Sequence, residues 1–164
     1  MAGVSRVLPA GVVGAGGVLD VRDEKAANTA GGTFTSGAQQ TRTLNTTAKN
    51  TITGASLASN QITLPAGTYL VQATAPGYAV NNHQARLYNT TDSSVAVLGT
   101  TEFSISTGPA PTSSFVNGVF TITASKVFEL QHRCSSTAAT NGFGAQANFG
   151  TTEVYAQVMI FKLS

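Results

Sequence analysis

The sequence predicts an all-β protein: an antiparallel jelly-roll sandwich that is trimeric and carries an extended N-terminal arm. Three observations predict this class. The closing stretch, Glu153 to Leu163, is apolar on both faces of an extended strand. Charged residues make up 10 % of the chain, against about 25 % in typical soluble domains. Turn residues recur at short spacing and no amphipathic helix is visible, which is typical of sandwiches and barrels.

The closing strand predicts both the core and the assembly. Successive side chains of a strand point to opposite faces, and strands buried on both faces are apolar almost throughout. No helix is predicted that could cover the second face, so the simplest cover is another copy of the chain. The predicted core face holds Val154, Ala156, Val158 and Ile160, and the predicted trimer interface holds Tyr155, Met159, Phe161 and Leu163.

About eight strands are expected between residues 20 and 164, by the spacing of turn signals. Pro65 and Gly67 form a turn in which proline presets φ, and Pro76-Gly77 is expected to interrupt a strand at a bulge or bend. The extended runs lie at residues 33–35, 41–47, 62–64, 68–75, 84–89, 95–99, 101–106, 115–124, 127–134 and 153–163.

Two late runs alternate most clearly. In residues 115–124, Phe120 and Ile122 share one face. In residues 127–134, Phe128 and Leu130 point inward, and the polar side chains between them point outward. Residues 135–150 are polar and glycine-rich, so we expect a loop there.

Several segments resemble known proteins. The run Ile62-Thr-Leu-Pro-Ala-Gly-Thr-Tyr-Leu-Val-Gln-Ala-Thr-Ala75, the strand pair from Gly118 to Gln131 and the closing strand resemble the tumour-necrosis-factor and complement-globular-head superfamily. This resemblance implies a ten-stranded jelly roll that trimerises with the closing strand near the threefold axis.

A second resemblance is to virion proteins of tailed bacteriophages, in tail-fibre tips and head-surface proteins. It covers residues 20–164 and implies a virion protein that is assembled in the host cytoplasm. The blocks that carry it are Thr29-Ala-Gly-Gly-Thr-Phe-Thr-Ser-Gly-Ala38, Arg42-Thr-Leu-Asn45, His83-Gln-Ala-Arg-Leu-Tyr-Asn89 and Phe128-Glu-Leu-Gln-His-Arg-Cys134.

Residues 1–19 form the expected arm, rich in Gly, Val and Ala and with Arg6 as its one charged side chain. We expect the arm to anchor the globular part, residues 20–164, to a capsid or tail protein. Burial of its apolar side chains alone does not offset the cost of ordering this glycine-rich backbone, so we expect order only where a partner also supplies hydrogen bonds. The anchoring side chains are expected to be Val4, Val7, Leu8, Val12 and Val13.

The expected function is therefore that of a homotrimeric head decoration or head-fibre protein. The chain is too short to build a tail-fibre trunk. The alternative is the receptor-binding tip of a short tail fibre, which would bind a host surface glycan or receptor through residues 107–114 and 135–150. An enzyme is not expected, because the acids stand in no recognisable hydrolase context.

Other partners are not expected. The net charge is +2 and no run of Lys or Arg exists, so no nucleic-acid partner is predicted. The apolar N-terminal residues are broken by Pro9 and several glycines, so neither a signal peptide nor a membrane helix is predicted.

No cofactor or metal site is predicted. His83 and His132 lie in different segments, with no ligand-type partner at metal-site spacing, so we expect each to hydrogen-bond within the fold. Cys134 has no cysteine partner and is expected to be buried, reduced and unreactive. Arg86 and Arg133 are expected either on an exposed strand face or in a partly buried ion pair with Glu129 or Glu102.

Overall fold

The structure is a computed structural model that describes residues 16–107 and 110–164. The described residues form eleven strands and no helix. These strands are β1 (Val18–Lys25), β2 (Gln40–Thr41), β3 (Thr46–Asn50), β4 (Ser56–Ala58), β5 (Gln61–Leu64), β6 (Gly67–Gly77), β7 (Asn81–Asn89), β8 (Ser94–Ser104), β9 (Thr112–Ile122), β10 (Lys126–Cys134) and β11 (Glu153–Lys162).

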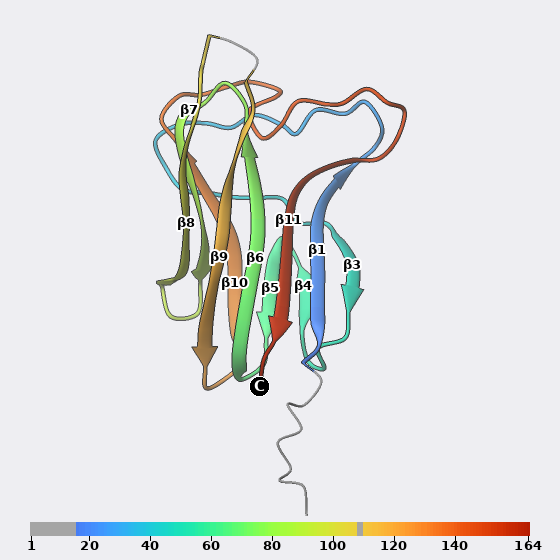
Figure 1. The fold of residues 1–164 in the computed structure, drawn as a ribbon, viewed down its shortest axis with the longest axis vertical. Coiled ribbons are helices and arrows are strands. Elements are labelled where there is room, and N and C mark those ends of the chain that lie inside the picture. Colours follow the sequence, from blue (N-terminus) through green and yellow to red (C-terminus); the bar gives the residue numbers. More distant parts are fainter. Residues whose placement is uncertain (1–15, 108–109) are drawn as a thin grey trace, which may run out of the picture.

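The strands form two antiparallel sheets that lie face to face (Figure 1). The five-stranded sheet has the order β3-β1-β11-β6-β9. The six-stranded sheet has the order β4-β5-β10-β7-β8, and β2 pairs with β10 beside this path. Strands distant in sequence are neighbours in both sheets, as in a jelly roll. The predicted all-β jelly-roll class is confirmed.

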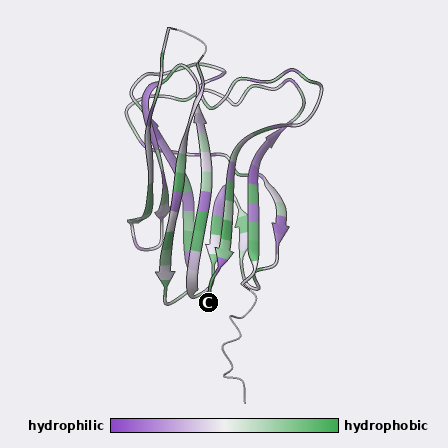
Figure 2. Ribbon diagram, viewed as in Figure 1, coloured by the Kyte–Doolittle hydropathy of each residue, from purple (hydrophilic) through white to green (hydrophobic). Residues whose placement is uncertain are grey.

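The core lies between the sheets and follows the predicted alternation. In β10, Phe128 and Leu130 are fully buried. In β6, Tyr69, Val71 and Ala75 are also fully buried and face them from the other sheet. Figure 2 shows the resulting alternation of apolar and polar positions along the strands.

The first strand was not predicted. Val18 pairs with Phe161 of β11, and Leu19 with Ile160. Leu19 and Val21 are fully buried. The last two residues of the predicted arm therefore belong to the sheet. The charged run from Asp20 to Lys25 does not show the alternation by which a strand is recognised in a sequence. Asp23, for example, points inward, where an apolar residue would normally lie.

Pro76 does not interrupt its strand, contrary to expectation. It lies within β6 and pairs with Ser113 of β9. The pairing of β6 with β11 ends at Thr74, so Pro76 lies where β6 has become an edge on that side. A sheet tolerates proline at such a position because no ladder hydrogen bond is lost.

The two ends of the sandwich differ. The long connections 26–39 and 135–152 gather at one end, the top of Figure 1. The chain enters β1 at the other end, beside the end of β11. Glu153 holds the upper loops together, because its carboxylate accepts hydrogen bonds from the backbone N–H groups of Asn28, Ala147 and Asn148 at 3.1–3.3 Å.

In residues 16–107 and 110–164 no helix is long and apolar enough to cross a membrane.

Candidate subunit interface

The outer face of the five-stranded sheet carries an apolar row that crosses four strands. Val18 of β1 lies opposite Phe161 of β11, Phe161 opposite Leu70 of β6, and Leu70 opposite Val119 of β9. Side chains that are directly opposite in a sheet point to the same face and contact one another. Val119 is 58 % exposed, and the other three are partly exposed. The row is therefore a continuous apolar band open to solvent.

The next row on this face is mostly polar. Met159 lies between Asp20 and Gln72, and Gln72 lies opposite Asn117. Leu163, which follows β11, is 40 % exposed. Of the four predicted interface residues, Met159, Phe161 and Leu163 thus remain accessible at this face. The prediction that they contact another copy of the chain stays a prediction.

Tyr155, the fourth predicted interface residue, points inward. Residues Arg22 and Glu24 of β1 pair with Gln157 and Val154, so β11 contains one extra residue between these pairs. Such a bulge reverses the alternation of side chains. Tyr155 is 8 % exposed, whereas Val154, predicted for the core, is 48 % exposed.

The inward position of Tyr155 is fixed by its surroundings. Its hydroxyl donates a hydrogen bond to the carbonyl of Thr29 at 2.6 Å. Its ring lies against Gly144, where a Cβ atom would come within 2.2 Å of the ring and where φ is +140°. Only glycine suits that position. The interface prediction for Tyr155 is therefore wrong, and Val154 replaces it on the outer face.

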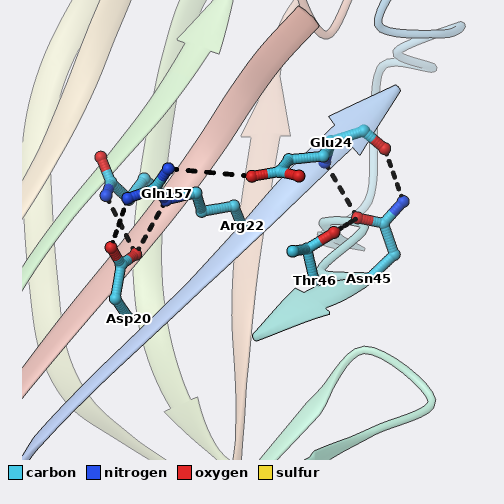
Figure 3. Close-up of polar contacts among 6 residues, drawn as sticks. All are labelled: Asp20, Arg22, Glu24, Asn45, Thr46 and Gln157. Carbon is cyan, nitrogen blue, oxygen red and sulfur yellow. Dashed lines mark hydrogen bonds and ion pairs between the residues drawn. The ribbon is translucent and has the colours of Figure 1, made fainter. Parts of the chain in front are cut away.

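A network of polar side chains lies beside the apolar row (Figure 3). Arg22 donates from Nε to Asp20 Oδ1 at 3.1 Å and from Nη2 to Asp20 Oδ2 at 2.5 Å. Gln157 Nε2 donates to Asp20 Oδ1 at 2.9 Å, and Glu24 lies 3.8 Å from Arg22 Nη1. Two-pronged pairing of this kind gives strong, directional contacts.

Asp20 stays ionised within this network. Burial raises its pKa, but the hydrogen bonds from Arg22 and Gln157 outweigh burial and hold the pKa below its ordinary value. Only 6 % of Asp20 is exposed. Because this carboxylate is already paired, a partner that covers the face does not leave it as an isolated buried charge.

Asn45 fixes the edge of the same face. Its Oδ1 accepts from the Glu24 N–H at 2.9 Å, and its Nδ2 donates to the Glu24 carbonyl at 2.7 Å (Figure 3). The side chain thereby imitates a strand partner just before β3 begins. This contact sets the position of β3 beside β1.

A second exposed apolar group lies at the edge of the sandwich where β8 and β9 meet. Ser114 Oγ donates to the Thr100 carbonyl at 2.7 Å and ties the two strands together across this edge. Leu98 and Phe103 of β8 are 59 % and 54 % exposed and lie opposite Arg86 and Asn82, on the outer side of the six-stranded sheet. Phe115 of β9 is 47 % exposed and lies on the same face as Val119 of the row. Each subunit therefore has two unlike apolar surfaces, the row on the face of the five-stranded sheet and Leu98 with Phe103 on β8 at the β8–β9 edge.

The two histidines form a buried chain that sequence reasoning missed. His83 Nδ1 and His132 Nε2 are 2.9 Å apart, and His83 Nε2 is 2.8 Å from Thr112 Oγ1. Arg42 Nη1 lies 3.5 Å from His132 Nδ1. Because Arg42 can only donate, His132 accepts at Nδ1 and donates at Nε2, and His83 then donates to Thr112. Both rings are neutral in this arrangement.

Arg42 carries the one charge of the buried group that it forms with His83 and His132. It is fully buried, and it donates to the carbonyls of Pro76 at 3.0 Å and Phe143 at 3.1 Å. Its guanidinium lies 4.2 Å from the centre of the Phe143 ring. Burial lowers the pKa of Arg42 to about 10, and the charge of Asp23 opposes that shift. At neutral pH the group therefore carries one positive charge beside two neutral imidazoles.

The remaining predicted residues lie as follows. Cys134 is 3 % exposed, and burial raises the pKa of its thiol to about 11, so its low reactivity stays an expectation. Arg86 donates to Gln131 Oε1 at 3.0 and 2.8 Å and forms no ion pair with Glu129. Arg133 is exposed.

Two further predictions concern metals and the arm. Within the described ranges no three His, Cys, Asp or Glu side chains are grouped so that they could hold a metal. The predicted anchoring residues lie outside the described residues, at Val4, Val7, Leu8, Val12 and Val13.

Comparison with known proteins supports the fold. No protein-family model and no curated protein matches the chain. Among solved structures, murine APRIL at pH 5.0 is similar with a TM-score of 0.58 and 12 % identity, over 90 % of this chain and 99 % of APRIL. The globular domain of zebrafish complement 1qA is similar with a TM-score of 0.57 and 13 % identity, over 91 % of this chain and 98 % of that domain.

These two likenesses agree with the tumour-necrosis-factor and complement-globular-head fold that the sequence resembles. At such low identity they show the fold alone. Neither concerns a virion protein, so a phage function is a matter for proposal.

Proposed function

We propose that this chain is a non-enzymatic structural subunit of a bacteriophage virion, a homotrimeric head decoration or head-fibre protein. The observation that carries the trimer is the pair of unlike apolar surfaces on each subunit. Two unlike surfaces join subunits head to tail. Such contacts form a closed ring of three when each subunit is rotated by a third of a turn relative to the previous one. The row at Val18, Phe161 and Leu70 would then be covered by the β8–β9 edge of the next subunit.

The mass of the native protein tests this assembly. Light scattering on the full chain at micromolar concentration is expected to give three times the 16.7 kDa of one chain. Burial of each large apolar side chain contributes about 1.5–3 kcal/mol, and each subunit offers several on both surfaces. A monomer at this concentration would end the proposal, and a twofold mass would replace the ring with a symmetric dimer.

The fold also supports the proposed direction of attachment. The chain enters β1 at the end of the sandwich opposite the long loops (Figure 1). A segment that precedes β1 and binds the particle would therefore hold this end inward and leave the loops facing out. Val4, Val7, Leu8, Val12 and Val13 are the side chains we propose for that contact.

Deletion of residues 1–15 tests the anchor. The deleted protein is expected to keep its trimer mass and to be absent from particles, because β1 begins only at Val18. Deletion of residues 1–19 is the informative comparison, since it also removes Leu19 from the core and is expected to destabilise the fold. If particles carry the 1–15 deletion protein at normal occupancy, the segment is not the anchor.

A second candidate function is the tip of a short tail fibre that contacts the host. The favouring observation is that the loop 135–152 is held by the hydrogen bond from Ala147 N–H to Glu153 and by packing of Gly144 against the Tyr155 ring, so it presents a fixed outward surface. Gold-labelled antibody against this chain on intact particles separates the two functions, since the label falls on the head for one and on the tail tip for the other.

A further inference from the structure

A polar pocket lies on the outer side of the six-stranded sheet, near the end that carries the long loops. Its volume is about 610 Å³, within the range usual for small-molecule sites. The residues whose side chains matter below are Ser36, Asn82, Gln84, Thr101, Arg133 and Ser135.

The floor of the pocket is a row of three side chains on adjacent strands. Arg133 of β10 lies opposite Gln84 of β7, and Gln84 lies opposite Thr101 of β8. Two strand spacings separate the outer members, a span of ~10 Å. Gln84 Nε2 donates to the Gly99 carbonyl at 2.8 Å, which orients the amide. Its Oε1 has no hydrogen-bond partner among the described residues and is available as an acceptor.

The wall of the pocket is fixed by backbone hydrogen bonds. Asn82 N–H donates to Ser135 Oγ at 3.0 Å, and Ser135 N–H donates to the Asn82 carbonyl at 2.9 Å. Ser36 N–H donates to Thr137 Oγ1 at 2.9 Å on the opposite side. The polar groups of the wall are therefore held in place before any ligand arrives, which lowers the entropic cost of binding.

Arg133 gives the pocket its charge. It is exposed, and no Asp or Glu in the described part of the chain lies within ion-pair distance of it. No acidic residue lines the pocket. The contrast is Arg86, whose guanidinium is occupied by Gln131 and lies 4.5 Å from the centre of the Tyr88 ring. A guanidinium with unused donors in a fork suits a carboxylate.

We propose that this pocket binds an acidic saccharide. The carboxylate of a uronic acid residue pairs with Arg133, and the ring hydroxyls exchange hydrogen bonds with Gln84, Asn82 and Ser135. This ligand class follows from the residues that line the pocket, which offer hydrogen-bond donors and acceptors side by side with one positive charge. A polyanion such as nucleic acid needs several cations along its path, and the pocket has one.

The site lies on the sheet opposite the apolar row, within a single subunit. Thr101 of β8 lines the site, so the site borders the β8–β9 edge that the proposed trimer covers. The inference is drawn for the single subunit and rests on neither the trimer nor the virion function. Failure of one therefore leaves the others testable.

The experiment uses the full chain, labelled with ¹⁵N, and two matched probes. Trigalacturonic acid is titrated against its methyl ester, which has the same sugar rings without the negative charges. Amide shifts are expected with the acid at Gly37, Asn82 and Ser135, which all line the pocket. Binding of the ester is expected to be at least ~10-fold weaker, about the contribution of one charge-assisted hydrogen bond. Arg133→Gln is expected to weaken the binding of trigalacturonic acid at least ~10-fold as well.

Lys49→Gln is the charge-matched control, because Lys49 is exposed on β3 of the other sheet. It is expected to leave binding unchanged. Three results overturn the proposal: no shifts at the pocket up to millimolar probe, equal binding of the acid and its ester, or equal weakening by R133Q and K49Q. The last result would mean that binding of trigalacturonic acid depends on the net charge of the protein and not on this pocket. Unchanged amide spectra outside the pocket in R133Q verify that the variant is folded.

Discussion

Phe161→Asp is expected to convert the proposed trimer into monomers. Phe161 lies in the centre of the apolar row, between Val18 and Leu70. The change removes about 2–3 kcal/mol of apolar burial at each contact and places a carboxylate in a dry interface, which costs several kcal/mol more. The dissociation constant is expected to rise at least ~1,000-fold, measured by sedimentation velocity across a concentration series.

The monomer itself is expected to stay folded in this variant, because Phe161 is only partly buried within its own subunit. Circular dichroism checks this. Phe149→Asp is the matched control, since Phe149 is 84 % exposed in the upper loop, away from the apolar row. If F149D and F161D both keep the native mass, the outer face of the five-stranded sheet is not the interface.

Acidification is expected to destabilise the fold between about pH 7 and pH 5.5, through the buried histidines. Burial lowers the pKa of His132 well below its ordinary value, and the charge of Arg42, together with that of His83 once His83 is protonated, lowers it further. Burial also lowers the pKa of His83, which Glu102 raises in part and Arg42 lowers. Unfolded histidine takes up a proton below about pH 6.5, and the folded rings do not.

The direction in which stability changes with pH follows from this difference in proton binding. The stability that the neutral rings contribute is fully present above about pH 6.5 and is lost as the pH falls toward their folded pKa values. Each histidine adds a slope to the unfolding free energy that grows from about 0.7 kcal/mol per pH unit at pH 6.5 toward about 1.4 kcal/mol per pH unit at the acid end of that window. Protonation of His132 would also break the donor chain, because its Nδ1 accepts from Arg42 and could no longer do so.

Urea unfolding at several pH values measures the slope. His132→Gln is the informative variant, because a Gln amide can still accept from Arg42 and donate to His83. Carboxylates such as Asp23 are common to both proteins, so they cancel in the comparison. The slope of the variant is expected to be lower by about one proton. Equal slopes in the two proteins would show that His132 does not control the acid response.

The sequence predicted the parts of this fold that repeat a simple pattern. In β10, large apolar residues alternate with polar ones, and one face is buried as expected. The closing strand was predicted from the apolar residues on both of its faces, and Ala156, Val158 and Ile160 are fully buried. Such patterns are local, so they can be read without knowledge of neighbouring strands.

Features that depend on pairing between distant segments could not be predicted. The bulge that turns Tyr155 inward is defined by the register of β11 against β1. The His83–His132 contact arises because Cys134 lies opposite His83 in the β7–β10 pairing, which brings the two rings together on one face. Arg42 reaches them from the segment between β2 and β3. Local sequence around each of these residues contains no sign of the others.

The position of β11 has a consequence for biosynthesis. It is the central strand of the five-stranded sheet, yet among the eleven described strands it comes last in the sequence, and its partner β1 comes first. All of residues 18–162 must therefore have left the ribosome before this sheet can close, and contacts of such long sequence separation form slowly. A nascent chain that stops before Glu153 has β1 and β6 as open edges on either side of an empty strand position. Those edges are templates for pairing with other chains, so folding after β11 has emerged, with the edges shielded until then, is the route that this topology favours.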